Sequence, residues 1–378
     1  MPTAIAFFPW LTLAERIEIG PVRLIPFALG ELPGDQPNVA QADIDAVLGA
    51  YANRPNKPVT DAVLLEVDEW RSGMEIDGES MDKLFNASAI LAFSALASRV
   101  LFQSHFGYVN SHSYLLIIQS FLPGDAGAFV FNARRREGYS SHYWSSKEFA
   151  FQRPNHVSDG HRADPQQPLA EALFQLPVVD PVLEAIKEFN AANTDSGDVP
   201  AHVELVMTKS AFEWLLLINS KKGSFLKALE ALVPTPRGGK DETPVRKQWL
   251  SRWTPTGDRL LLAWASDFCA LRGESAHGST GAPVLWDAKK HMAFCAIFLP
   301  LAVKLVLAKR KLLTLSQDDL ALLDRVEDFL LYDPFESTDK DQFVSAWSKV
   351  HTRIRMGVIA QKLYGEEEPS EAEGPAED

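Results

Sequence analysis

The chain has 378 residues, of which 46% are hydrophobic, and this length exceeds what one ordinary core buries, so we expect two domains with appendages. Its 2 cysteines, Cys269 and Cys295, both have apolar neighbours, which excludes a disulfide-stapled secreted protein and indicates reduced, buried thiols. The formal net charge of −13 excludes a chain that binds nucleic acid through an overall positive charge.

The N-terminal half, residues 1–155, mixes strand and helix patterns. Its first ten residues lack the basic start of a secretory leader, which together with the two thiols predicts a cytoplasmic protein. Apolar, β-branched and aromatic runs predict strands at 18–27, 62–67, 113–122 and 128–132. The Ala-, Leu- and Phe-rich segment 81–102 predicts a buried helix. We therefore expect an α+β domain over 1–155.

The polar, proline-rich segment 153–168 is the best candidate for a domain boundary. Beyond it, apolar residues at helical spacing predict helices at 182–190, 201–218, 224–232, 246–250, 258–269, 287–310, 320–331 and 342–363. Ser316, three residues before Asp319, predicts a capping box. The loop 234–244 is polar and glycine-rich, so we expect it to be mobile. Residues 169–364 are thus expected to form an all-α helical bundle.

The end of the chain carries an apolar run and then an acidic one. The run 292–308 is shorter than the roughly 20 residues of a membrane span and contains Pro300 and Lys304, so we predict a buried helix and no membrane contact. Residues 365–378 hold seven acids and no base, which leaves −6 for the rest of the chain. Without aromatic or branched side chains this tail cannot bury enough surface to fold. We expect a disordered, solvated tail, or else a mimic of nucleic acid that shields a basic site.

The most informative stretch lies at the end of the apolar segment 260–270. There Arg272 and His277 stand five residues apart, and Gly278 follows. Arginine carries a permanent charge and a planar fork that suits phosphate oxygens, and histidine can give or take a proton near neutral pH. Together they predict a site that breaks a phosphodiester without a metal.

With this motif the C-terminal half resembles the HEPN superfamily, and within it the ApeA-like branch. The resemblance rests on Arg272-x4-His277, on an upstream helical segment that runs into Leu-Glu-Ala-Leu at 229–232, and on the long apolar helix after residue 287. The N-terminal half is similar to the β-rich domain that accompanies this branch. The resemblance covers roughly half of the chain.

The resemblance implies a helical bundle that dimerises and acts as a metal-independent endoribonuclease without a cofactor. It implies an RNA substrate, a role as a defence or toxin effector, and an N-terminal domain that senses or recruits, with a phage-derived or antitoxin-like protein as a partner. Residues five apart on a regular helix point about 140° apart, so a site that uses both side chains needs two copies of the motif. Glu274, three residues before His277, would orient that histidine or raise its pKa, or would simply face solvent.

Gly273 departs from the family pattern, because active members commonly carry Asn, Asp or His directly after the arginine. It favours an alternative function, a catalytically inactive HEPN scaffold that binds nucleotide or a partner protein. Both hypotheses remain open from the sequence.

Two further basic groups are candidate RNA contacts. Arg134, Arg135 and Arg136 precede Tyr139, Tyr143 and Trp144, and basic residues beside aromatics suit an RNA backbone with stacked bases. Arg246 and Lys247 belong to a basic spread around the loop 234–244 that would steer RNA toward the motif. For the first group a charged hairpin turn is the favoured alternative, and for the second a solvated face is an equally good explanation. None of the 9 histidines has the spacing of a zinc site, so no metal is expected.

Overall fold

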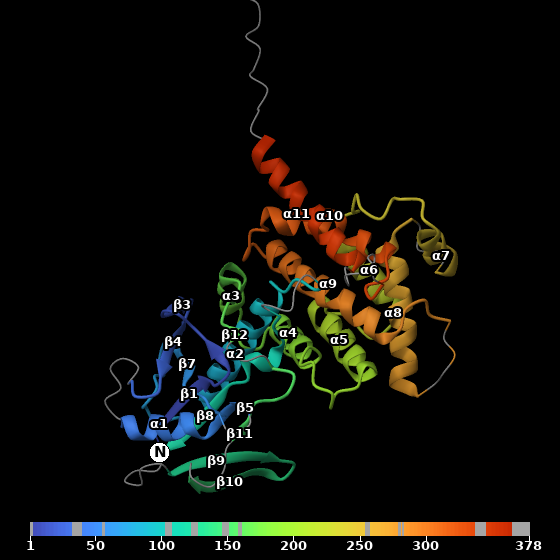
Figure 1. Cartoon of the computed structure of the whole chain (residues 1–378). Helices are drawn as coiled ribbons and strands as arrows, with labels where there is room; N and C mark the ends of the chain where they lie inside the picture. The colour runs from blue at the N-terminus through green and yellow to red at the C-terminus, as the bar shows by residue number, and fades with distance from the viewer. Residues whose placement is uncertain are drawn as a thin grey trace, which may run out of the picture.

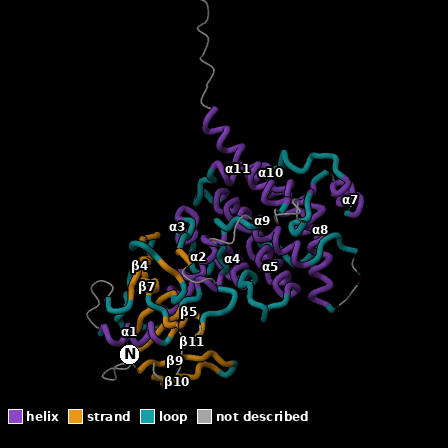
Figure 2. The backbone as a smooth tube through the Cα atoms, in the orientation of Figure 1, coloured by secondary structure: helices purple, strands orange, loops and turns teal. Residues whose placement is uncertain are grey.

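The computed structural model describes residues 3–31, 40–54, 57–102, 108–121, 128–145, 151–157, 161–253, 258–278, 281, 283–336 and 345–364. For residues 54, 128–135, 138–145, 277 and 364 it describes the backbone alone. An N-terminal α/β region is followed by a C-terminal helical region, as the sequence predicts (Figure 1). Figure 2 shows the strands gathered at one end of the molecule, with α1 (Gln41–Gly49) beside them, and most of the other helices toward the opposite end. The acidic tail 365–378 lies outside the described residues.

The N-terminal region is built on one sheet, in which each pair of neighbouring strands is antiparallel. Among the described residues it has 7 strands, in the order β10 (Gly138–Ser145), β9 (Ala128–Arg135), β8 (Ile117–Phe121), β1 (Ala4–Phe8), β7 (Asp61–Val67), β4 (Val22–Ala28) and β3 (Ile17–Ile19). Short strands lie beside it: β2 (Leu11–Thr12), β5 (Tyr51–Arg54), β6 (Lys57–Pro58), β11 (Phe151–Gln152) and β12 (His161–Arg162).

Two of the predicted strands differ in detail. The segment 18–27 is not one strand but the β3–β4 hairpin, because Gly20 adopts φ +54° and turns the chain. The segment 113–122 begins with the 3₁₀ turn η1 (Ser111–Tyr114), where the Asn110 side chain accepts a hydrogen bond from the backbone of Ser113. Local capping therefore shortens that strand to β8.

Successive side chains of β1 belong alternately to two hydrophobic cores. Ala4, Ala6 and Phe8 face the long helix α2 (Gly78–Leu96), and Ile5 and Phe7 belong to the other core, which contains α1 (Gln41–Gly49). Successive side chains of a strand point to opposite faces of the sheet, so a continuous apolar run such as this one indicates a strand buried on both faces. The sheet is thus covered by a helix on each side.

The core on the α2 face continues without interruption into the helical region. The predicted boundary 153–168 leads into α3 (Gln167–Phe174), which packs on α2 and β3. The helices that follow are α4 (Pro181–Ala191), α5 (Ala201–Leu216), α6 (Lys222–Leu232), α7 (Pro244–Arg252), α8 (Leu260–His277), α9 (Ala288–Lys309), α10 (Gln317–Arg325), the 3₁₀ helix η2 (Val326–Leu331) and α11 (Ala346–Tyr364).

The predicted buried helix is α9, which packs against α2, α5 and α6. Within the described part of the chain it is the one helix long and apolar enough to cross a membrane by length and composition, and 72% of its apolar window is buried inside the fold. The predicted capping box is also present, since Ser316 and Asp319 each accept a hydrogen bond from the other's backbone.

The loop 234–244 was expected to be mobile, but it is fastened to the helical region. Gly238 donates to the carbonyl of Asp324 at 2.8 Å, and Gly239 donates to the Asp328 carboxylate at 2.6 Å. Gly239 has φ +70°, and a Cβ there would lie 2.7 Å from that of Glu327. The glycines permit close packing at this position rather than motion.

Candidate active site

Helix α8 carries the Arg272–His277 motif. The predicted helix ended at residue 269, but α8 is continuous through His277 and ends at Gly278, which adopts the left-handed φ of +65°. At the other end of α8, the buried carboxylate of Glu327 accepts from the backbone of Leu260 and Leu261 at 3.2 Å each. In Figure 1 the motif end of α8 lies at the outer edge of the helical region, away from the sheet.

Arg272 is half-buried, and its Nε atom is buried without a hydrogen-bond partner among the described residues. Three residues earlier on the same helix, burial raises the pKa of the Cys269 thiol to about 11. The charges of Lys209, Lys222 and Arg272 oppose that rise, so three cations lie around this thiol. The face of α8 that carries Arg272 is therefore electropositive, and Cys269 is a half-buried thiol whose raised pKa makes it a poor nucleophile.

The two lysines near Arg272, Lys209 on α5 and Lys222 on α6, each lie against an aromatic ring. Lys209 is 1% exposed; it donates to Glu213 at 2.8 Å and lies 4.6 Å from the centre of the Phe225 ring. The Lys222 ammonium lies 5.6 Å from the Trp253 ring. Lys209 is neutralised by Glu213, whereas Lys222 has no ion-pair partner within the described ranges. Lys222 and Arg272 are thus the cations available to an anion.

The other face of α8 carries His277 and Glu274. The regular helix places His277 about 140° from Arg272 and about 60° from Glu274 around the axis. The side chain of His277 lies outside the described residues, and Glu274 is half-buried and engaged in an interaction. Apart from its chain neighbours and the backbone of its own helix, a Cβ at Gly273 would meet no atom within 4 Å, so the lack of a side chain answers no steric need.

A buried carboxylate fixes the chain that follows the motif. Asp267 is 0% exposed; its Oδ1 accepts from Trp253 Nε1 at 2.7 Å and from Leu285 N at 2.8 Å. Its Oδ2 accepts from Trp286 N at 3.0 Å and contacts His291 Nε2 at 3.1 Å. Asp267 therefore ties α8 to the end of α7, to the returning loop and to α9. Sequence reasoning missed this group, since Asp267 stands alone in an apolar run and its partners are up to 24 residues away.

His291 serves this network as a neutral ring. Burial is the largest influence and lowers its pKa, against the opposing effect of Asp267. Nε2 is the nitrogen that donates to Asp267, and Nδ1 is buried without a partner among the described residues. This histidine is 0% exposed, so it holds the fold rather than a substrate.

The predicted RNA contacts have different outcomes. Arg134 and Arg135 lie on β9, with only their backbone described, and exposed Arg136 stands in the β9–β10 turn. The predicted charged hairpin is therefore present.

Arg246 requires a correction. It is 4% exposed, and its guanidinium donates to the carbonyls of Gly239 and Asp258, the latter at 3.0 Å. It fastens the loop 234–244, which leaves it no surface for an RNA phosphate, whereas its neighbour Lys247 is exposed. A cation predicted from sequence to be solvated is here used to satisfy buried backbone carbonyls.

The histidines of the N-terminal half lie closer together than their sequence spacing suggests. His112 Nδ1 and His156 Nε2 are 2.6 Å apart, and burial, followed by His156, lowers the pKa of His112. Within the described ranges no three His, Cys, Asp or Glu residues form a group that could hold a metal ion. His105 and the side chain of His142 lie outside the described residues.

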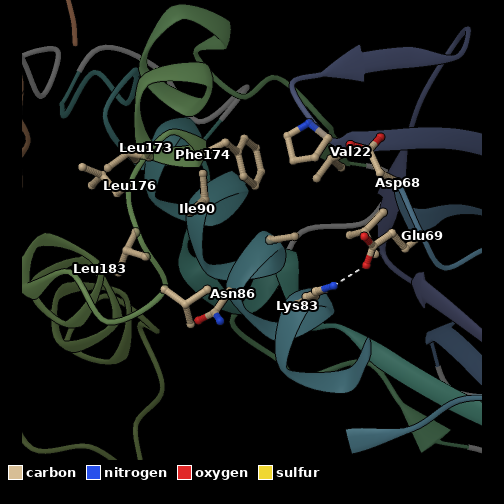
Figure 3. Close-up of a pocket in the computed structure, with 14 residues that line it drawn as sticks. Val22, Asp68, Glu69, Lys83, Asn86, Ile90, Leu173, Phe174, Leu176 and Leu183 are labelled. Atoms are coloured by element: carbon tan, nitrogen blue, oxygen red, sulfur yellow. Dashed lines mark hydrogen bonds and ion pairs between the residues drawn. The ribbon is translucent and has the colours of Figure 1, made fainter. Parts of the chain in front are cut away.

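A cavity of about 270 Å³ opens between the sheet edge and helices α2 and α3 (Figure 3). Its walls are mostly apolar, with Ile90, Leu173 and Phe174 around the interior, and the Lys83–Glu69 ion pair of 2.5 Å at its border. Its charged lining residues are Asp68, Glu69 and Lys83, of which Glu69 and Lys83 neutralise each other, and no histidine is among the described residues that line it. The candidate active site remains the end of α8.

In comparisons with known proteins, no family model, curated protein or solved structure matches this chain.

Proposed function

We propose that the chain is a metal-independent endoribonuclease whose site is completed by a second copy of the chain. The observation that carries the proposal is the continuity of α8, which brings Arg272 and His277 to one exposed helix end but on different faces. The electropositive face around Arg272, with Lys222 beside Trp253, supports it as a place for phosphate oxygens and a stacked base.

The chemistry follows from the two residue types. Neutral His277 removes the proton from a ribose 2′-hydroxyl, and the 2′ oxygen attacks the adjacent phosphorus. Arg272 binds the phosphate oxygens and stabilises the charge that develops on them. The bond to the 5′ oxygen breaks, and that oxygen takes up a proton. The products are a 2′,3′-cyclic phosphate and a 5′-hydroxyl, and DNA is inert because it lacks the nucleophile.

The geometry supports a composite site. Side chains about 140° apart on one helix do not converge on one phosphate, whereas two copies of α8 packed side by side would bring Arg272 of one and His277 of the other together. With an RNA substrate, the role that follows from the family resemblance is a defence or toxin effector, in which the N-terminal region receives a phage-derived or antitoxin-like protein.

The test is cleavage of total RNA by the purified protein in EDTA. We expect wild type to leave cyclic phosphate ends, and Arg272→Ala and His277→Ala each to lose about 10²–10⁴-fold in rate. Arg355→Ala and His202→Ala are matched controls, since both residues are exposed and lie on other helices. Cleavage that survives both motif substitutions, or that needs a divalent metal, would contradict the mechanism.

Mixing the two inactive variants tests the composite site. In an equal mixture, half of the dimers contain one copy of each variant. If each site takes Arg272 from one copy and His277 from the other, one of the two sites in such a dimer is intact. The mixture then recovers about a quarter of wild-type activity. No recovery, with mixed dimers demonstrated by differential tags, would place both residues of a site on one chain. If wild type cuts no RNA at all, the inactive scaffold favoured by Gly273 is the better description.

A further inference from the structure

A second cavity, of about 370 Å³, lies where the segment after α2 meets the first turns of α5 and α9. It is therefore at the junction between the α/β region and the helical region, whose elements meet near the centre of Figure 1. Its volume falls at the lower end of the range of small-molecule sites. Its lining includes three aromatic and four charged side chains: Phe102, Tyr108, Phe335, Arg99, Asp195, Glu204 and Lys289.

The apolar part of the cavity suits a compact apolar group. The aromatic rings of Phe102, Tyr108 and Phe335 stand around it, and Tyr108 and Phe335 are 38% and 44% exposed. Ala201 and Ala293 contribute small side chains from α5 and α9, which leave the space open. Exposed aromatic rings around a concave surface are typical of a binding site rather than of a packed core.

Two charges of opposite sign in this cavity have no partner. The half-buried Glu204 carboxylate has no hydrogen bond or ion pair with any described residue, and burial, then Asp195, raises its pKa to about 7. The Lys289 ammonium is exposed and also has no ion-pair partner within the described ranges. An unpartnered buried charge is costly, so Glu204 gains most from a bound cation.

The other two charges of the cavity differ in their surroundings. Arg99 donates to Asn193 at 2.7 Å and to the Val109 carbonyl at 3.3 Å, and it lies 5.5 Å from the Tyr108 ring centre. Asp195 is exposed, so water solvates its carboxylate, and its charge raises the pKa of both Tyr108 and Glu204. The half-buried Glu204 carboxylate and the Lys289 ammonium are therefore the pair of charges that a ligand would engage.

We propose that this cavity binds a free α-amino acid with an apolar side chain. The ligand's ammonium pairs with Glu204, its carboxylate pairs with Lys289, and its side chain lies against the aromatic rings. A phosphorylated metabolite fits less well, because two carboxylates would face its double negative charge and only one cation is unpartnered. The proposal goes beyond RNA cleavage and does not depend on it.

The test is calorimetric titration of the full chain with phenylalanine and leucine, beside phenethylamine and 3-phenylpropionate, which each lack one of the two charges. We expect the amino acids to bind and each analogue to bind at least about tenfold more weakly. Glu204→Gln and Lys289→Met should each weaken binding by about tenfold or more, because each leaves one ligand charge unpaired. Glu188→Gln is the matched control, since Glu188 is also a half-buried acid with a raised pKa but lies outside the cavity.

The pH dependence gives an independent readout. Ionisation of Glu204 near pH 7 predicts binding about tenfold tighter at pH 8 than at pH 6, with the difference abolished in Glu204→Gln. Three results would overturn the proposal: no binding of either amino acid by folded wild type, equal binding of an analogue that lacks one charge, or unchanged binding after both substitutions.

Discussion

Removal of the Asp267 carboxylate is the sharpest test of how the motif end of α8 is held. In Asp267→Ala four donors lose their acceptor: Trp253 Nε1, Leu285 N, Trp286 N and His291 Nε2. The site is 0% exposed, so water replaces the carboxylate poorly. The substitution therefore removes the link between α8, the returning loop and α9.

The magnitude follows from those contacts. Each buried donor without a partner costs about 1–3 kcal/mol, and partial hydration and repacking keep the total below the simple sum, so we expect a loss of about 3–5 kcal/mol in unfolding free energy. Asp267→Asn should cost only about 1–3 kcal/mol. Its amide oxygen retains two donors, and neutral His291 can change tautomer to accept from the amide group.

The assay is urea unfolding followed by tryptophan fluorescence, together with amide hydrogen exchange of residues 284–287. We expect Asp267→Ala to lose stability and also protection in that segment, and Asp267→Asn to retain most of both. Ser266→Ala is the control, since the buried Ser266 hydroxyl only donates back to the Leu262 carbonyl of its own helix at 3.1 Å. A loss below about 1 kcal/mol in Asp267→Ala, with exchange unchanged, would refute the role of this network.

Three further substitutions test other features. Gly239→Ala should lower the free energy of unfolding by about 2–4 kcal/mol in chemical unfolding, because the left-handed backbone and the close approach to Glu327 both disfavour a Cβ. Gly30→Ala is the control: Gly30 has φ +83° but open space around it, so the loss should be only about 1 kcal/mol. Burial, then Arg355, lowers the pKa of His351 from an unfolded value of about 6.5 to about 4, so its contribution is present above pH 6.5 and is lost as pH falls toward 4. The free energy of unfolding of the wild type should therefore fall by up to about 3 kcal/mol between pH 7 and pH 4.5 because of His351. His351→Leu should remove this fall, and urea titrations at the two pH values measure it. Gly273→Asn should fold normally and, if the motif is an active one, raise the rate of RNA cleavage; a variant that folds but cleaves no faster would show that the glycine is not what limits activity.

The fold could be predicted from the sequence where a single local pattern dominates. The apolar run of α9, the capping box at Ser316 and the strand β7 were all predicted, because periodicity and caps act within a few residues. Predicted boundaries were wrong where a local conformation intervened. Gly20 turns one expected strand into a hairpin, and the expected helix 320–331 divides into α10 and the 3₁₀ helix η2.

The candidate site was predictable only where its residues lie close together in sequence. Arg272, Glu274 and His277 are neighbours along one helix, so their spacing alone gives their relative directions. Asp267 and His291 lie in apolar segments that reveal no partner, and the burial of Arg246 depends on carbonyls contributed by a loop. Contacts between segments distant in sequence decide these roles, and such contacts leave no local pattern.

Helix α5 connects the two proposed sites. Glu204 in its first turn lines the central cavity, and Lys209 and Glu213, about 8 and 14 Å further along the axis, lie beside the Arg272 face of α8. A ligand that binds Glu204 therefore acts on the same helix that carries Lys209 and its ion-pair partner Glu213. Linkage then requires that the amino acid and RNA change each other's affinity by the same factor. Titration of phenylalanine with and without a 2′-O-methyl RNA, which cannot be cleaved by 2′ attack, measures that factor; a factor of one would mean that the cavity and the motif are independent sites on one helix.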